Sequence, residues 1–192
     1  MNVAERSRER IAQVALDLFV ANSYEGTSLQ MIASLLRITK PAITYHFGSK
    51  EDLLAAVAEP AFVDAEKYFH SLERQPASAA RRREALSGYV DLLVKHRSLM
   101  VFLLQDAGVV RNRALKERVT RLAERLMQAF VRDPADTGER VYIAAALGGL
   151  RSATAAFPEL SDSELHTHLL EAGRRMLSRP ARRSPAPADP PA

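Results

Sequence analysis

The sequence predicts an all-α protein of about nine helices. Apolar residues recur at spacings of three and four along most of the chain, and the breaks between these stretches carry Gly, Pro, Asn, Asp or Ser. The alternating apolar and polar pattern of strands does not compete with these spacings. Of the 192 residues, 47% are hydrophobic, which is enough to bury a core. We therefore expect a folded helical protein.

Three helices are expected in the N-terminal quarter. The first has one apolar face, made by Ile11, Val14, Ala15, Leu18 and Phe19. A run of turn formers ends it, and Thr27 or Ser28 can cap a short second helix. Thr39 is a good N-cap for the third helix, because Pro41 then lies in the first turn, where its missing N–H has no cost. Gly48 ends this third helix.

Longer helices are expected after residue 48. Ser49 is followed three residues later by Asp52, which is close to a capping box, and the helix that begins there extends to about Leu72. Pro60 should kink this helix near Glu59 and not divide it. Five more helices are predicted, at residues 79–96, 98–105, 112–131, 139–156 and 161–177. Residues 179–192 are mostly Pro, Ala and Arg and predict a disordered tail.

Composition excludes several classes of function. There is no cysteine, so disulfides, thiolate metal sites and cysteine nucleophiles are excluded. Residues 1–10 are charged and polar, which predicts neither a signal peptide nor a membrane span. The net charge of +4 permits a polyanionic partner, but residues 1–50 hold six basic and four acidic residues. Charge alone therefore does not identify a DNA-binding segment.

The second and third predicted helices, joined by a tight turn, form a helix-turn-helix. In this motif the second helix lies in the major groove of DNA. Ile43 and Phe47 are one helical turn apart and should point into the core of the three helices. The residues left closer to the DNA side are Lys40, Ala42, Thr44, Tyr45 and His46. Core packing is the alternative interpretation for Tyr45 and His46.

The detailed sequence is more specific than the generic motif. It runs Thr27-Ser28-Leu29-Gln30-Met31-Ile32-Ala33, then Ile38-Thr39-Lys40-Pro41-Ala42-Ile43-Thr44-Tyr45-His46-Phe47, then Ser49-Lys50-Glu51-Asp52-Leu53. Over about a quarter of the chain, this resembles the N-terminal domain of the tetracycline-repressor (TetR) family. The resemblance implies a homodimer with a DNA-binding domain at residues 1–48 and a helical ligand-binding and dimerisation domain at residues 49–178.

The resemblance also implies roles for the residues of the motif. Lys40, Pro41 and Ala42 would face base edges; a lysine can donate to guanine, and a methyl group or proline ring can pack on a thymine methyl. Phosphates would be held by Thr44, Tyr45, His46 and Lys50. Thr27 and Ser28 start a helix whose free N–H groups suit a phosphate oxygen, and ordinary capping is their alternative role.

Two positions depart from the usual pattern of the family. Arg37 occupies a turn position that is usually Gly, so it adopts a left-handed conformation at a cost or forces a different turn. Its guanidinium would then be a further phosphate contact. Thr44 stands where Tyr is more common, which shortens or removes that phosphate contact, and Tyr45 is placed to compensate.

The last two predicted helices carry a predicted dimer seam. Residues 144–149 are a run of small residues apart from Leu147, and small residues allow a second helix to approach closely. The expected interface residues are Ala145, Gly148, Gly149, Leu165, Leu169, Gly173 and Met176. A two-fold four-helix bundle would result, as in the family. The alternative is a close contact inside one subunit.

A ligand pocket is implied by the resemblance, between the fourth predicted helix and the helix at residues 112–131. The candidate lining residues are Phe62, Phe69, Tyr89, His96, Phe102 and Gln105. The aromatic residues have core packing as their alternative role, and His96 has that of a cation at a helix C-terminus. Walls of this composition favour an apolar ligand.

The leading hypothesis is a cytoplasmic, nucleoid-associated repressor that binds a palindromic operator as a homodimer and is released by a small molecule that moves the fourth helix about Pro60. No cofactor, metal or membrane partner is expected. An enzyme is the first alternative, but the histidines form no His-Glu-x-x-His site, and no phosphate loop or nucleophile elbow is present. A helical adaptor that binds protein and not DNA is the second.

Overall fold

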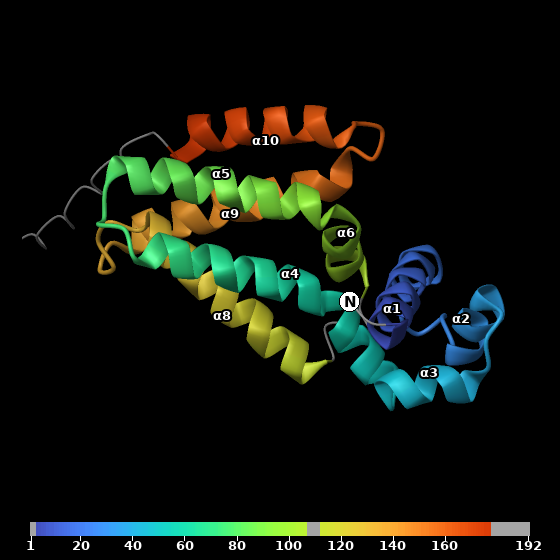
Figure 1. Cartoon of the computed structure of the whole chain (residues 1–192). Coiled ribbons are helices and arrows are strands. Elements are labelled where there is room, and N and C mark those ends of the chain that lie inside the picture. Colours follow the sequence, from blue (N-terminus) through green and yellow to red (C-terminus); the bar gives the residue numbers. More distant parts are fainter. Residues whose placement is uncertain (1–2, 107–111, 178–192) are drawn as a thin grey trace, which may run out of the picture.

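The computed structural model describes residues 3–106 and 112–177, and within these ranges the chain forms nine α-helices and no strand. Figure 1 shows α1, α2 and α3 gathered at one end of the molecule and the other helices packed as a larger bundle. The helices are α1 (Val3–Asn22), α2 (Leu29–Leu36), α3 (Lys40–Phe47), α4 (Lys50–Glu73), α5 (Ala79–Lys95), α6 (Arg97–Gln105), α8 (Arg113–Phe130), α9 (Thr137–Ala156) and α10 (Asp162–Leu177). The all-α prediction is confirmed, and the five predicted C-terminal helices end within two residues of those observed. The predicted tail lies outside the described residues.

Side-chain caps fix the starts of α2, α3 and α4. The Ser28 hydroxyl accepts from Met31 N at 3.2 Å, and the Thr39 hydroxyl accepts from Ala42 N at 3.3 Å. Ser49 and Asp52 form a complete capping box, in which each side chain accepts from the backbone N–H of the other residue. Each cap satisfies an N–H group that the helix itself leaves free, so the helix starts are set locally.

The turn between α2 and α3 is made by Arg37 in the left-handed conformation, with φ 56° and ψ 40°. The Arg37 N–H donates to Ser34 O at 3.2 Å, and Ile38 N donates to Ala33 O at 3.0 Å. Of the two expected alternatives, the left-handed turn is therefore the one present. These hydrogen bonds offset part of the cost of placing a side chain where glycine is favoured.

The helix α4 continues from Lys50 to Glu73 through Pro60, so the prediction of one helix is confirmed. Two hydrophobic cores meet along it. The N-terminal core joins the buried residues of α1, α2 and α3 to residues 53–62 of α4, and it also takes in Leu99 and Phe102 of α6 and Leu115 of α8. The C-terminal core joins residues 65–72 of α4 to the buried faces of α5, α8, α9 and α10. Movement of α4 would therefore disturb both cores.

Ion pairs and cation–π contacts join α4 to α8. Arg118 forms an ion pair with Glu59 at 2.5 Å, and its guanidinium lies 4.1 Å from the centroid of the Phe62 ring. Arg118 holds the pKa of the Glu59 carboxyl below its usual value by hydrogen bonding. Two helical turns further along α8, Arg125 forms an ion pair with Glu73 at 2.8 Å, and its guanidinium lies over the Phe69 ring. Both arginines use their stems and their charges to bind the same neighbouring helix.

Candidate nucleic-acid interface and ligand cavity

The helix α3 presents one face to the core and the other to solvent. Ile43 and Phe47 are 0% and 5% exposed, which confirms that they point inward. Tyr45 is 86% exposed, so core packing is excluded for this side chain. Lys40 and Pro41 at the start of the helix are also exposed, and Ala42 is half-buried. The predicted residues at the start of α3 therefore share an accessible surface.

The helix α1 holds α3 in position. The Arg8 guanidinium lies 4.8 Å from the centroid of the Phe47 ring, and its Nη1 donates to His46 O at 3.1 Å. The His46 side chain is half-buried beside the rings of Tyr45 and Phe47. The orientation of the C-terminal end of α3 is thus fixed from both α1 and its own aromatic residues.

The two residues expected at the start of α2 differ in accessibility. Thr27 is only 1% exposed, and its hydroxyl lies 3.0 Å from Leu18 O and 2.9 Å from Ser23 O, to which it donates. The Thr27 side chain has no O–H to offer a phosphate, because its only O–H is used inside the fold. The contact expected from the free backbone N–H groups at this helix start stays a prediction. Ser28 is exposed and accepts a hydrogen bond as the cap, so its own O–H is still available.

The remaining predicted phosphate contacts have different surroundings. The Thr44 hydroxyl donates back to Pro41 O at 3.1 Å, so its proton is engaged within α3. The Lys50 ammonium lies 4.2 Å from the centroid of the Tyr24 ring, which restrains it beside the loop between α1 and α2. Arg37 is exposed at the turn. Of the ten residues predicted to contact DNA, the exposed ones are therefore Ser28, Arg37, Lys40, Pro41 and Tyr45.

The predicted dimer seam divides into two sets. Ala145 and Gly149 are exposed on α9, and a Cβ atom built on Gly148 or Gly149 would meet nothing within 4 Å. On α10, in contrast, Leu165 and Leu169 are 1% and 3% exposed and belong to the C-terminal core. Gly173 is buried against Leu86 of α5 and Leu150 of α9.

The placement of Leu165, Leu169 and Gly173 in the seam is therefore corrected, because α5 and α9 of the same subunit already cover them. Met176 is half-buried, and its carbonyl accepts from the Tyr142 hydroxyl. Of the predicted interface residues, the small residues of α9 are therefore the ones that a second subunit could contact.

An apolar cavity of about 290 Å³ lies between α4, α5, α6 and α8, with Arg151 of α9 in its wall. Four of the six predicted residues line it, namely Phe62, Phe69, Tyr89 and His96. Burial raises the pKa of the Tyr89 phenol to about 12, and its O–H donates to Leu147 O at 3.1 Å. Tyr89 is therefore a neutral polar group at the edge of an apolar space.

Phe102 and Gln105 do not line this cavity, and their predicted roles are corrected. Phe102 points into the N-terminal core, where its ring stacks on Phe19 with centroids 5.5 Å apart. Gln105 is exposed at the end of α6. The sequence reasoning missed Lys116 and Arg151 in the wall, because nothing in a single helix shows which of its charged residues borders a cavity.

Comparison with known proteins finds bacterial transcriptional regulators both for the N-terminal segment and for most of the chain. Residues 11–57 match the family model described as bacterial regulatory proteins, tetR family. The HTH-type transcriptional repressor Rv3405c of Mycobacterium tuberculosis is 29% identical in an alignment that covers 87% of this chain and 87% of its own. A TetR/AcrR-family regulator from Thermobifida fusca is 27% identical, with a TM-score of 0.59, over 93% of this chain and all of its own.

The N-terminal segment of the chain, residues 11–57, therefore matches the TetR-family model. Over most of its length the chain is similar to transcriptional regulators with a helix-turn-helix. A further structure with the TetR fold is AibR, solved in complex with isovaleryl coenzyme A and operator DNA, which is 23% identical with a TM-score of 0.64 over 85% of this chain and 95% of its own. Within residues 3–106 and 112–177, no helix is long and apolar enough to cross a membrane, and no three His, Asp or Glu side chains are grouped to hold a metal ion.

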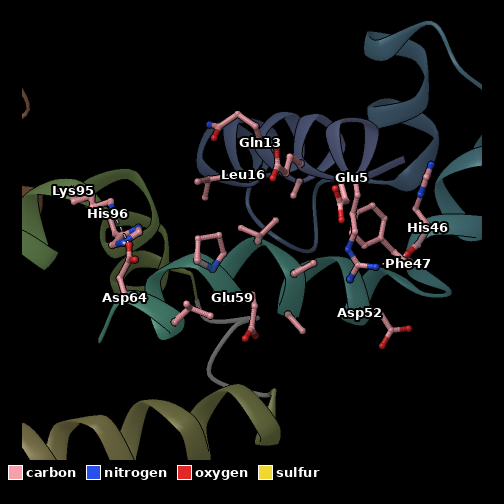
Figure 2. A pocket seen from close by; sticks show the side chains of 18 residues that line it. Glu5, Gln13, Leu16, His46, Phe47, Asp52, Glu59, Asp64, Lys95 and His96 are labelled. Atoms are coloured by element: carbon pink, nitrogen blue, oxygen red, sulfur yellow. Dashed lines mark hydrogen bonds and ion pairs between the residues drawn. The ribbon is translucent and has the colours of Figure 1, made fainter. Parts of the chain in front are cut away.

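The protein also has a groove of about 1060 Å³ between α1 and α4. Figure 2 shows His46 and Phe47 at one end of it and Asp64, Lys95 and His96 at the other. Asp64 is 2.8 Å from both Lys95 Nζ and His96 Nε2, and these hydrogen bonds hold the pKa of its carboxyl below the usual value. Because His96 also lines the apolar cavity, this cluster lies between the cavity and the groove beside α1.

Proposed function

We propose that this regulator is a ligand-responsive repressor that binds a palindromic operator as a homodimer and is released by a small molecule. The observation that carries the proposal is the two-sided character of α3, which buries Ile43 and Phe47 and exposes Lys40, Pro41 and Tyr45. An exposed Lys at the start of the second helix of a helix-turn-helix, with an exposed Tyr further along the same helix, suits major-groove binding. Since such a protein acts on chromosomal DNA, we place it in the cytoplasm with the nucleoid.

The proposed contacts follow from accessibility. Lys40, Pro41 and Ala42 read base edges, and Tyr45 binds a phosphate in place of the shorter Thr44. Ser28, Arg37 and Lys50 supply further phosphate contacts, with His46 supporting the Tyr45 ring. Residues 1–48 form the proposed DNA-binding domain, and residues 49–178 form the proposed ligand-binding and dimerisation domain.

Dimerisation is proposed through the exposed small residues of α9. A single helix-turn-helix covers only one half-site, so a symmetric operator requires two copies. Ala145, Gly148 and Gly149 would let the α9 helices of two subunits approach closely, with Met176 at the edge. The repressor named in M. tuberculosis supports the repressing role, and the AibR complex supports combined ligand and operator binding.

Ligand response is proposed to act through α4, which contributes to both cores and to the apolar cavity. A ligand in the cavity that favours one position of α4 over another would change the placement of α3. Pro60 lies in the stretch of α4 that packs in the N-terminal core, just before the C-terminal core begins at Ala65, and is the proposed pivot. If Pro60→Ala leaves both operator affinity and ligand response unchanged, Pro60 has no such role.

The test is binding to duplexes from the region upstream of the protein's own gene, followed by fluorescence anisotropy at several salt concentrations. We expect affinity for one palindromic duplex to fall as salt rises, because phosphate contacts release counterions. Lys40→Ala and Tyr45→Ala should each weaken this binding by roughly tenfold or more while the dimer stays intact. Loss of the dimer in either variant, or binding that ignores both sequence and salt, would contradict the proposal.

A further inference from the structure

The fully charged side chains described in the wall of the apolar cavity are all positive. Among the residues that the structure describes, the ionisable side chains of this wall are Tyr89, His96, Lys116 and Arg151, and no Asp or Glu residue lines it. The remainder of the wall is aliphatic and aromatic, with small alanines on α4. An apolar space whose only full charges are positive favours an occupant with an apolar body and a negative group.

The carboxylates of α4 from Glu59 onward are already engaged by other cations. Glu59 and Glu66 pair with Arg118, Glu73 pairs with Arg125, and Asp64 holds both Lys95 and His96. His96 therefore has its own counter-ion. In the part of the chain that the structure describes, neither Lys116 nor Arg151 has an ion-pair partner.

Arg151 is the better placed of these two cations. The Tyr89 hydroxyl, itself in the wall, binds Leu147 O, and Leu147 is one helical turn before Arg151 on α9. The positive charge of Arg151 acts on the Tyr89 phenol and opposes the effect of burial on its pKa. A guanidinium in the wall of the cavity suits a carboxylate, which an arginine can bind with two parallel hydrogen bonds, whereas the Tyr89 O–H is engaged with Leu147 O.

The size of the cavity limits the occupant. A volume of about 290 Å³ is near the lower end of small-molecule sites, and at roughly 30 Å³ per water it holds the equivalent of about ten waters. The cavity is elongated, since its lining on α4 runs from Ala58 to Phe69, a rise of roughly 16 Å along the helix. A molecule with a short, narrow apolar body fits these dimensions.

We propose that the cavity binds a compact apolar carboxylic acid, with the apolar body between α4 and α8 and the carboxylate held by Arg151 beside Tyr89. This inference rests on the proposed ligand response, because it names the class of ligand for that same site. It assigns the counter-ion role to Arg151 and not to Lys116.

The test compares three straight-chain probes, decanoate, decan-1-ol and decylamine, by calorimetric titration of the full-length dimer at a mildly alkaline pH. We expect decanoate to bind at least tenfold more tightly than decan-1-ol, and decylamine to bind most weakly. Arg151→Gln should lower decanoate affinity to that of decan-1-ol. The matched control is Arg140→Gln, which changes an exposed arginine of the same helix outside the cavity wall and should leave the preference intact.

Equal or tighter binding of decan-1-ol or decylamine, or no binding of any probe, overturns the inference. Loss of the preference in Lys116→Gln but not in Arg151→Gln overturns the role of Arg151. Ala61→Phe places a ring in the cavity and should abolish binding of all three probes while thermal melting shows a folded protein; retained binding would place the probes elsewhere.

Operator affinity, measured in the same samples, separates this inference from the proposed function. Decanoate binding that depends on Arg151 but leaves operator affinity unchanged supports the carboxylate site and contradicts the ligand response. Operator release by another compound, with no decanoate binding, overturns the carboxylate site alone.

Discussion

The outer face of α3 and the inner face of α10 lie far apart in the molecule and have opposite relations to the rest of the chain (Figure 1). On α3, Lys40 and Tyr45 are exposed and Ile43 beneath them fills the N-terminal core. On α10, Leu165 and Leu169 are covered by helices of the same subunit. The difference teaches that an apolar or polar stripe can bind a second molecule only where the fold itself leaves it uncovered.

The same contrast occurs within a single pair of neighbours. Thr27 and Ser28 are adjacent hydroxyl residues before α2, yet Thr27 is buried with its O–H donating to the backbone and Ser28 is exposed. Of the two, only Ser28 is accessible to a phosphate group. Exposure, and not residue type, separates the residues that support the fold from those available to DNA.

The helices could be predicted because their signals are local. Ser28, Thr39 and Ser49 each cap the helix that follows, and Gly48, with φ 70°, ends α3. The inward direction of Ile43 and Phe47 followed from the helical period alone. These features need no knowledge of the rest of the chain.

The partners of the C-terminal helices could not be predicted in this way. The apolar stripe that includes Leu165 and Leu169 has the same period whether it packs on α5 of its own subunit or on a second subunit. The helical period of α6 allows Phe102 to line the cavity as well as to stack on Phe19, and only the long-range contact with Phe19 decides between the two. Tertiary contact between distant segments decides such positions, and a helical period carries no information about it.

The largest test of the contrast is Leu165→Ala on α10. Because this side chain is 1% exposed, its loss should lower the free energy of unfolding by roughly 2–5 kcal/mol. The matched control, Leu35→Ala at a position that is 61% exposed, should change it by less than about 0.5 kcal/mol. Chemical denaturation at two protein concentrations measures both free energies of unfolding. A small effect of Leu165→Ala would contradict its place in the core and support its predicted place in the dimer interface.

The next largest effect is expected for Ala145→Glu on the exposed face of α9. A carboxylate placed in a close helix contact between subunits is left unpaired and repels its symmetry mate, so the dimer dissociation constant should rise at least tenfold, about 1.4 kcal/mol. Ala114→Glu, on an exposed position of α8, is the control and should leave the constant unchanged. Analytical ultracentrifugation gives both values; an unaffected dimer in Ala145→Glu would exclude this face.

A smaller effect separates Thr27 from Ser28. Thr27→Val removes an O–H that bonds two backbone carbonyls and should cost about 1 kcal/mol of stability without a specific loss of operator affinity. Ser28→Ala removes a cap of similar worth, about 1 kcal/mol, and should in addition weaken operator binding. Equal losses of operator affinity in the two variants, after correction for stability, would remove the distinction.

The smallest expected effect is the pH dependence of Asp64. Lys95 and His96 hold the pKa of this carboxyl below its usual value, so its charge stabilises the folded state above the unfolded pKa of about 4, and this contribution is lost as pH falls through the folded pKa. The free energy of unfolding should therefore fall more steeply below about pH 4 in the parent protein than in Asp64→Asn. Thermal melts across the acid range measure this difference, and parallel curves would show that the cluster contributes nothing.

The most direct test of the central claim, that the exposed face of α3 reads DNA, is selection of bound duplexes from a random-sequence pool. The account predicts enrichment of an inverted repeat with half-sites about one helical turn, roughly 10 base pairs, apart or a multiple of it. In Lys40→Ala the base preference should relax at one fixed position of each half-site, whereas Tyr45→Ala should weaken all sequences alike. A pool that shows no enriched sequence, or one whose preference is unchanged in Lys40→Ala, would contradict the claim.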